Sequence, residues 1–293
     1  MRDLFRLIRP RGYCGLVLSH DAVSVRRVGV SRKAAAVVVE RLLAGHEPHE
    51  GVAAADMLAA HLAAAVDEAG CNGLPVHVTL ADDLVRYFIV TPPANGARMQ
   101  DLRAAAEVRF QMLYGDAASA WQVAADWQAA EPFLACAVSR RVSMALQVAA
   151  QQGGGCLVSV TPNFVSAWNG SRRQIGAHTW LATLSDCALT LGLVADTSKP
   201  RLASVRTLML PEPNPPLVWL RESVARAALL DNVAAPAVLH IHGPQIPGWQ
   251  QDAASSGEAG MSVLWCEFGS RPHAFKGRGA SWLSRLAWRG APS

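Results

Sequence analysis

The sequence carries little charge, and lysine is its rarest charged residue. Charged residues make up 17% of the 293 positions, against a usual share of about 25%. Lysine stands only at positions 33, 199 and 276, although Lys and Arg together number 27. The formal net charge of +4 is spread along the chain and forms no basic stripe, so the sequence predicts no nucleic-acid partner. Hydrophobic residues reach 51%, which excludes a globally disordered chain.

Long apolar runs and paired cysteines are also missing. No run approaches the ~20 apolar residues that a membrane-spanning helix needs. Arg6 and Arg9 interrupt the apolar residues near the start, so we expect no signal peptide. The six cysteines are widely spaced, and most lie in apolar stretches. This pattern is typical of free thiols in a reducing compartment, and we expect a cytoplasmic protein.

The common catalytic and binding motifs are absent. The chain has no phosphate-binding GxxxxGK[ST] loop, GxGxxG, HExxH or GxSxG. The glycines at 153–155 follow a predicted helix and end it. Ser19, His20 and Asp21 are adjacent on a turn, which cannot supply the geometry of a hydrolase triad. Residues 46–50 read as a solvated loop. His240 and His242 share one face of a strand, where hydrogen-bonded histidines are favoured over metal ligands.

Hydrophobic periodicity predicts alternating strands and helices. Residues 34–39 fit either a strand or a helix. A strand–strand–helix–strand order occurs early in the chain and again after residue 170, which indicates an α/β protein of two related halves with a boundary near 165–178. We expect strands at 13–18, 23–28, 76–80, 85–90, 121–127, 133–138, 156–160, 180–184, 188–194, 202–210, 238–242 and 262–267, and helices at 56–69, 99–113, 140–151, 162–168 and 217–230.

Four segments carry a resemblance to a known family. They are the hairpin at 15–24, the strand at 84–93 that runs into Pro92 and Pro93, the helix at 99–115, and the stretch 133–155. Together they resemble the type IV pilus assembly protein PilM and the cytoplasmic domain of the type II secretion protein GspL. The resemblance implies an α/β, actin-like (ASKHA) two-lobed fold with mixed sheets flanked by helices. It places an N-terminal lobe at 1–170, a C-terminal lobe at 171–274, and a basic aromatic tail at 275–293.

In that family the first hairpin wraps nucleotide phosphates, and an acidic residue on it helps to hold Mg²⁺. Here Gly15 keeps the first glycine, Val17 stands at the acidic position, Ser19 at the turn glycine and Ser24 at the terminal lysine. Valine offers no oxygen to Mg²⁺, and Asp21 lies beyond the turn. A side chain at the turn also hinders the close approach of backbone to phosphate. We therefore expect a degenerate phosphate hairpin.

The two later nucleotide motifs are degenerate as well. The second hairpin carries Ser185-Asp186-Cys187, and the adenosine loop keeps Gly243 followed by Pro244. We expect no cofactor, although ATP with Mg²⁺ stays possible, and a non-enzymatic pseudo-ATPase. The alternative is an actin-fold ATPase or kinase with divergent phosphate hairpins, whose acidic candidates are Asp21, Asp186 and Asp196.

The resemblance also implies a partner. PilM-like proteins take the short cytoplasmic tail of the bitopic membrane protein PilN in a groove on their N-terminal half. By resemblance we expect a scaffold on the cytoplasmic face of the inner membrane, peripheral to it, in a type IV pilus or type II secretion machine, with a motor ATPase as a possible further partner. The 275–293 tail could lie on an anionic membrane, in a partner groove, or against its own domain. The candidate tail-binding residues are Arg86, Phe88, Val90, Leu102 and Phe110.

Overall fold

A computed structural model describes residues 12–29, 38–43, 52–94, 98–195, 199–249 and 261–266. The chain forms two compact units, and neither unit is one continuous segment. Among the described residues, unit 1 takes those up to Ala81 and Arg140–Thr161, and unit 2 takes Asp82–Ser139 and those from Pro162 onward. The predicted lobes at 1–170 and 171–274 follow the repeat along the sequence. The two compact units divide the chain differently, because residues 82–139 belong to the same unit as most of the second half. The lobe boundaries stay a prediction.

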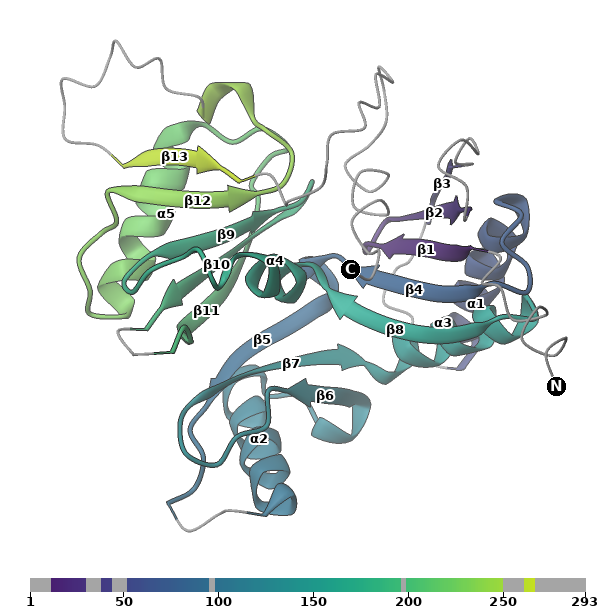
Figure 1. Ribbon diagram of the computed structural model, residues 1–293, viewed down its shortest axis with the longest axis horizontal. Coiled ribbons are helices and arrows are strands. Elements are labelled where there is room, and N and C mark those ends of the chain that lie inside the picture. Colours follow the sequence, from purple (N-terminus) through teal and green to yellow (C-terminus); the bar gives the residue numbers. More distant parts are fainter. Residues whose placement is uncertain are drawn as a thin grey trace, which may run out of the picture. The chain divides into compact units, whose positions relative to one another are not determined.

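Unit 1 is a five-stranded mixed sheet with two helices (Figure 1). Helix α1 packs against β2, β3 and the second helix, α3. The central strands of the unit 1 sheet are buried along most of their length, as the apolar runs of the sequence predict. The strand order is β3-β2-β1-β4-β8, with β1 (Tyr13–Leu18), β2 (Ala22–Val28), β3 (Val38–Leu42), β4 (Pro75–Leu80) and β8 (Cys156–Pro162), and the helices are α1 (Val52–Glu68) and α3 (Arg140–Gln152).

Unit 2 contains a second five-stranded sheet. One side of helix α5 packs on it through Leu220 and Val224 in a core that includes the fully buried Trp180 and Trp249. The strand order is β11-β10-β9-β12-β13, with β9 (Trp180–Leu184), β10 (Ala188–Val194), β11 (Leu202–Met209), β12 (Val238–His242) and β13 (Ser262–Trp265), and the helices are α4 (Asn163–Ser171) and α5 (Leu217–Leu230).

An inserted segment between β4 and α3 adds a small sheet to unit 2. One helix, α2, packs on this sheet through Leu102, Ala106 and Phe110, and the segment has its own hydrophobic core. The order is β5-β7-β6, with β5 (Val85–Val90), β6 (Trp121–Ala125), β7 (Phe133–Ser139), α2 (Met99–Tyr114) and the short 3₁₀ turns η2 (Asp82–Leu84) and η3 (Ala118–Ala120).

The two five-stranded sheets share one topology. In each, the first two strands form an antiparallel hairpin and the third strand continues antiparallel. The fourth strand then pairs parallel with the first. This repeated order confirms the duplication that the sequence predicts. The repeat is interrupted once, by the insertion after β4.

The predicted elements in the described ranges are confirmed, with ends that shift by a few residues. The open choice at 34–39 resolves as a strand that begins at Val38, while residues 34–37 lie outside the described part. The glycines at 153–155 end α3 as expected: Gly154 adopts a left-handed backbone with φ of 65°, and Gly155 N–H donates to Ala150 O. Strands β4 and β5 follow one another closely, yet they join different sheets.

Candidate functional site

The β1–β2 turn, the first predicted phosphate site, is closed by a serine. Ser19 N–H donates to Ala22 O at 2.9 Å, and Ala22 N–H donates to Ser19 Oγ at 3.1 Å. The buried Ser19 hydroxyl lies 2.8 Å from Asp21 Oδ1 and 3.1 Å from Ala22 O, so its proton goes to one of these two acceptors. The carboxylate of Asp21 thus serves the turn itself.

The β9–β10 turn repeats this chemistry. Ser185 N–H donates to Ala188 O at 2.9 Å, and Ala188 N–H donates to Ser185 Oγ at 3.0 Å. The Ser185 hydroxyl is buried and donates to Ala188 O at 3.1 Å. The sequence predicts degenerate phosphate hairpins at these two segments. In the structure both segments are the same kind of serine-closed turn.

This turn chemistry is unfavourable for phosphate. Phosphate is held by backbone N–H groups that point outward from a hairpin or nest. The N–H groups of Ala22 and Ala188 are already taken by serine hydroxyls. On β1, the Val17 side chain is fully buried, and the residue lies in register with Ser24 on β2 and Thr79 on β4. Val17 therefore belongs to the core of unit 1.

Gly243, the remnant of the predicted adenosine loop, has a packing role. Its φ is 151°, a backbone conformation that side chains rarely adopt. A Cβ at this position would lie 2.4 Å from the carbonyl oxygen of Leu184, at the end of β9. The glycine is therefore explained by its close approach to β9, with no need of a ligand.

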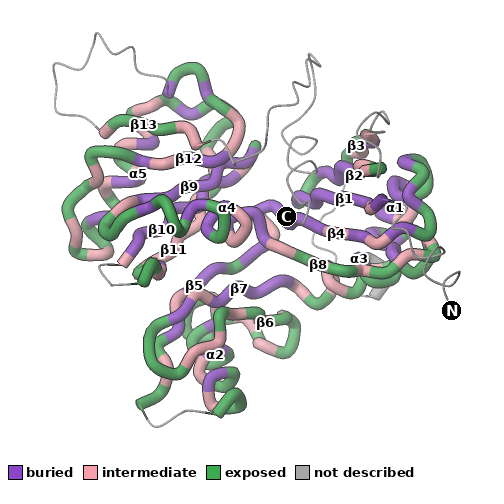
Figure 2. Tube along the Cα trace, in the orientation of Figure 1, coloured by how far each residue is buried: buried purple, intermediate pink, exposed green. Residues whose placement is uncertain are grey.

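The predicted tail-binding residues lie mostly inside the protein. Phe88, Val90, Leu102 and Phe110 are buried in the core between α2 and the small sheet (Figure 2). They cannot touch a partner without unfolding that core. Arg86 alone of the set is exposed, and its guanidinium stacks on the rings of Tyr114, at 5.4 Å, and Trp121, at 5.8 Å.

Among the described residues, no further strand pairs with the outer edge of β8, and this surface was not predicted from the sequence. Strand β8 is the last strand of the first sheet, and its exposed positions alternate along the strand. Cys156, Val158 and Val160 are exposed, with Val158 at 54%. Met144 and Val148, one turn apart on the preceding α3, are exposed as well. The alternation of β-branched residues at 156–161 is the signal that could have marked this strand as a half-exposed edge.

A buried carboxylate, Asp82, is the second feature that the sequence reading missed. Tyr87 Oη and Phe164 N–H donate to its Oδ1 at 2.5 and 2.9 Å. Thr183 Oγ1 donates to its Oδ2 at 2.5 Å, and Asn163 Nδ2 at 3.4 Å. Burial raises the pKa of Asp82, while these hydrogen bonds act in the opposite direction. Asp82 ties η2 to β5, β9 and the first turn of α4, which is a structural role.

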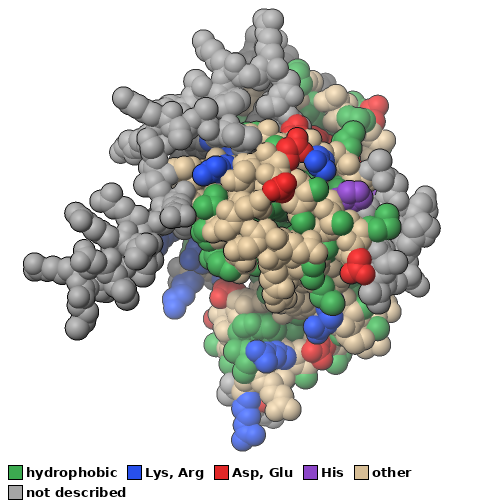
Figure 3. Space-filling view, turned by 90° about the vertical axis from the view of Figure 1, so that its right-hand side faces the viewer, with side chains coloured by type: hydrophobic (Ala, Val, Ile, Leu, Met, Phe, Trp, Pro, Cys, Tyr) green, Lys and Arg blue, Asp and Glu red, His purple; other side chains and the backbone are tan. Residues whose placement is uncertain are grey.

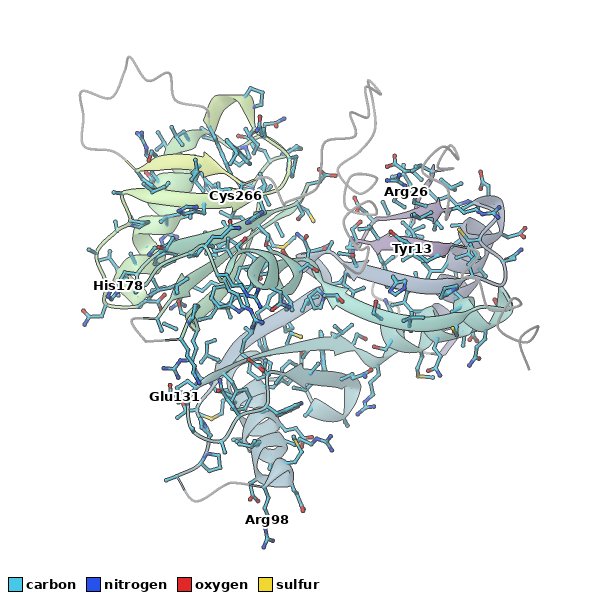
Figure 4. The ribbon with its side chains drawn as sticks, in the orientation of Figure 1. Tyr13, Arg26, Arg98, Glu131, His178 and Cys266 are labelled. Carbon is cyan, nitrogen blue, oxygen red and sulfur yellow. The ribbon has the colours of Figure 1, made fainter. Side chains whose placement is uncertain are left out.

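The strand histidines have hydrogen-bonding neighbours. His242 is buried, with Nε2 2.9 Å from Ser171 Oγ, and His240 Nδ1 lies 3.6 Å from Cys266 Sγ (Cys266 is labelled in Figure 4). Within the described ranges, no three His, Cys, Asp or Glu side chains gather as metal ligands. Residues 46–50, Asp196 and the 275–293 tail lie outside those ranges.

Comparison with solved structures identifies the architecture. The chain superposes on a Bacteroides thetaiotaomicron protein described as having an actin-like ATPase fold and unknown function, with a TM-score of 0.58, 8% identity, and 97% of each chain covered. The chain has an actin-like ATPase fold. This confirms the predicted fold class. No protein-family profile matches the sequence, and no curated protein matches it either.

Two further matches come from secretion and pilus systems. The cytoplasmic domain of EpsL, an inner membrane component of the type II secretion system of Vibrio cholerae, matches with a TM-score of 0.51 and 11% identity, over 95% of this chain and 93% of that one. The PilM-PilN type IV pilus biogenesis complex matches with a TM-score of 0.46 and 16% identity, over 75% of this chain and 66% of that one, just under two thirds of its length. The EpsL match confirms the predicted resemblance at the level of the fold. No helix among the described residues is long and apolar enough to cross a membrane.

Proposed function

We propose that this actin-like chain is a non-enzymatic scaffold. It would act on the cytoplasmic face of the inner membrane, within a type II secretion or type IV pilus assembly platform, by binding the cytoplasmic tail of a PilN-like bitopic membrane protein. The observation that carries the proposal is the pair of serine-closed turns, because they stand where an actin-like ATPase needs open phosphate hairpins. The fold shared with the inner membrane component EpsL supports the setting.

Strand β8 is the site that we assign to the tail. An extended peptide can add to the free edge of a sheet, where backbone hydrogen bonds give affinity and alternate side chains give specificity. The edge of β8 presents Val158 and Val160 to such a peptide. Arg86, the one exposed residue of the earlier candidate set, belongs to the other unit and is not part of this assignment.

The tail site is tested by capture from the cell's own membranes. The purified chain, immobilised, is expected to retain a bitopic protein from a detergent extract, and a synthetic peptide of that protein's cytoplasmic tail should compete. Val160→Lys should weaken peptide binding about tenfold or more, because it places a charge on the apolar edge. Val218→Lys is the matched control, since Val218 is an exposed valine on α5. Equal binding by both variants would remove β8 from the proposal.

The absence of nucleotide chemistry is tested by calorimetric titration with Mg-ATP. We expect no heat of binding from the parent chain, and none from Val17→Asp combined with Ser19→Gly, which restores the missing carboxylate and turn glycine. Circular dichroism would confirm that this double variant folds, because Val17 is fully buried. Binding with ATP turnover by the parent chain would contradict the scaffold and support the actin-fold ATPase or kinase, with Asp21 and Asp186 as the acidic groups to replace first.

A further inference from the structure

Two buried cysteines of unit 1 lie in contact although they are far apart in the sequence. Cys14 is on β1, the middle strand of the first sheet, and Cys71 follows the end of α1. Both thiols are free and buried. A hydrogen bond joins them, in which the Cys14 thiol donates to the Cys71 sulfur. Contact between the two side chains is the first geometric requirement of a disulfide.

The backbone at Cys71 is held by the C-terminal cap of α1. Gly70 has a left-handed backbone with φ of 64°, and its N–H donates to Asp67 O at 2.8 Å. Cys71 N–H donates to Val66 O at 3.0 Å, which completes a Schellman motif. Gly70 and Asn72, on either side of Cys71, are exposed. A small local opening of this turn is therefore enough to bring a small oxidant to the Cys71 thiol.

The side chain of Arg27 lies at the same place. Arg27 is directly opposite Cys14 in the β1–β2 ladder, and residues paired in this way point to the same side of a sheet. Its Nη1 lies 3.4 Å from the point where a Cβ of Gly70 would stand, next to Cys71 in the chain. Strand register and the capped turn thus bring β1, β2 and the end of α1 together, independently of the hydrogen bond between the thiols.

The surroundings make Cys71 the more nucleophilic thiol of the pair. The hydrogen bond from Cys14 and the positive charge of Arg27 lower the pKa of Cys71, although burial acts in the opposite direction. The same hydrogen bond, together with burial, raises the pKa of Cys14. Because the thiolate is the form that attacks an oxidant, Cys71 is the residue that reacts first.

The last turn of α1 also brings negative charge close to Cys71. Glu68 accepts a hydrogen bond from Arg41 Nε at 2.9 Å, and Asp67 accepts one from Asn72 Nδ2 at 2.5 Å. Carboxylates held in this way repel a thiolate less than free carboxylates do, so they do not cancel the effect of Arg27. Figure 3, which looks onto the side of the molecule where unit 1 lies, shows charged side chains of both signs.

We propose that Cys14 and Cys71 are a modification site, at which hydrogen peroxide forms a reversible disulfide. The Cys71 thiolate attacks one peroxide oxygen, the O–O bond breaks, and a sulfenic acid and hydroxide result. The sulfur of Cys14 then attacks the sulfenic sulfur. The S–S bond forms, the S–O bond breaks, and the hydroxyl group leaves as water with the proton of Cys14. Two thiols are oxidised and one peroxide is reduced.

The disulfide would tie the end of α1 to the middle strand of the first sheet. In reducing compartments such bonds are transient, because small thiols open them again. The site requires neither a nucleotide nor a membrane partner and therefore goes beyond the proposed scaffold.

The inference is tested by peptide mapping of the full chain with Cys156→Ser, which removes the one exposed thiol. The protein is treated with hydrogen peroxide, and the remaining thiols are alkylated in denaturant. Trypsin without reductant then gives peptides 12–26 and 42–86, which contain one cysteine each. We expect these peptides to be joined, with a mass lower than their sum by two hydrogens. Dithiothreitol should separate them again.

Matched variants distinguish this pair from buried cysteines in general. Cys71→Ala should leave Cys14 unlinked, whereas Cys136→Ala, which removes a buried thiol of the other unit, should leave the link unchanged. Arg27→Gln should slow disulfide formation by about threefold or more, because less of Cys71 is then thiolate. Arg26→Gln makes the same charge change on the opposite face of β2 and should slow it less. Circular dichroism spectra that match the parent would confirm that each variant folds.

Two results would overturn the inference. Separate peptides with Cys71 oxidised to sulfinic acid would show that Cys14 does not attack the sulfenic acid. Free Cys14 and Cys71 at a peroxide dose that oxidises Cys156 in the parent chain would show that the two cysteines have a packing role alone. Equal rates in Arg27→Gln and Arg26→Gln would contradict the activation of Cys71 by Arg27.

Discussion

At the scale of single residues, Asp82 shows how one side chain can hold several segments together. It lies where the chain enters unit 2, immediately after β4, and accepts hydrogen bonds from β5, α4 and β9. Four donors converge on two oxygens, so removing the carboxylate would strand several buried polar groups at once. Such a cluster is costly to disturb because unpaired buried donors have no water to bond.

Asp82 gives the first prediction, which concerns stability against pH. Burial raises the pKa of Asp82 above its value in the unfolded chain, so between the two pKa values the folded protein holds a proton that the unfolded chain has lost. The free energy of unfolding of the parent chain should therefore fall, relative to that of Asp82→Asn, as the pH rises from about 4 toward neutrality. Urea denaturation of both proteins across this range measures the difference.

A free energy of unfolding that rises with pH would mean that the hydrogen bonds to Asp82 outweigh its burial.

A second variant gives the size of the cluster's contribution. Asp82→Ala should lower the free energy of unfolding at neutral pH by about 3 kcal/mol or more, since Tyr87 Oη, Thr183 Oγ1 and Phe164 N–H lose their acceptor together. Asn at this position keeps one acceptor oxygen and should cost less.

At the scale of elements, the two hairpin turns are built alike although their sequences differ. Ser-His-Asp-Ala closes β1–β2, and Ser-Asp-Cys-Ala closes β9–β10. Only the first serine and the alanine are shared, and these are the two residues that exchange hydrogen bonds. A serine hydroxyl accepts a backbone N–H within its own turn, which lets the turn close without glycine.

The second prediction follows from this likeness. Ser19→Ala and Ser185→Ala should each lower the free energy of unfolding by about 1 kcal/mol, because each removes side-chain hydrogen bonds at a buried turn. Ser19→Ala should cost slightly more, since the carboxylate of Asp21 is within reach of the Ser19 hydroxyl and hydrogen bonds to charged groups are stronger than those to neutral ones. Denaturation followed by circular dichroism measures both. If only one of the two substitutions lowers the free energy of unfolding, the two turns do not contribute alike to stability despite their common geometry.

The same two turns show what sequence reasoning could and could not reach. The strands on either side were predictable because Tyr13–Leu18 and Ala188–Val194 are short, mainly apolar segments next to a turn that contains polar residues. The loss of the glycines was also visible in the sequence. The serine bonds were not, since they depend on backbone geometry that periodicity does not report.

Burial explains why the predicted tail-binding residues other than Arg86 do not form a surface. Phe88 belongs to an alternating apolar pattern on a strand, and Phe110 to an apolar stripe on a helix. Residues that face a core follow the same patterns, so an apolar residue at such a position is more often a packing residue than a recognition residue. Asp82 was missed for the converse reason. An Asp-Asp pair after an apolar strand is typical of an exposed loop, and its burial depends on Phe164 and Thr183, about 80 and 100 residues away in the sequence.

At the scale of the whole molecule, the described residues of unit 2 form two separate hydrophobic cores. One lies under α5 and the other under α2, and no residue is common to both. Segments with separate cores can open independently, since the free energy of local opening depends on the contacts that are broken. The two large sheets have the same strand order, and the inserted segment with its own core is the part of the chain that interrupts this duplication.

The third prediction concerns these cores. Phe110→Ala should remove about 3–5 kcal/mol of packing from the inserted segment. Amide hydrogen exchange should therefore speed up in α2, β5, β6 and β7, with little change in β9, β10 and β12. Leu220→Ala, which truncates a fully buried residue of the other core, is the reciprocal control. Faster exchange throughout unit 2 in both variants would show that the two cores unfold together.

Strand β8 also offers a place to attach a reporter. Cys156 is the one exposed cysteine of the six, because Cys14, Cys71 and Cys136 are buried and Cys187 and Cys266 are partly covered. Burial also raises the pKa of Cys136 to about 11, which slows its reaction with thiol reagents further. A maleimide dye should therefore label the natural chain first at the start of the free edge. Its fluorescence would register whatever binds beside Val158, with no engineered cysteine.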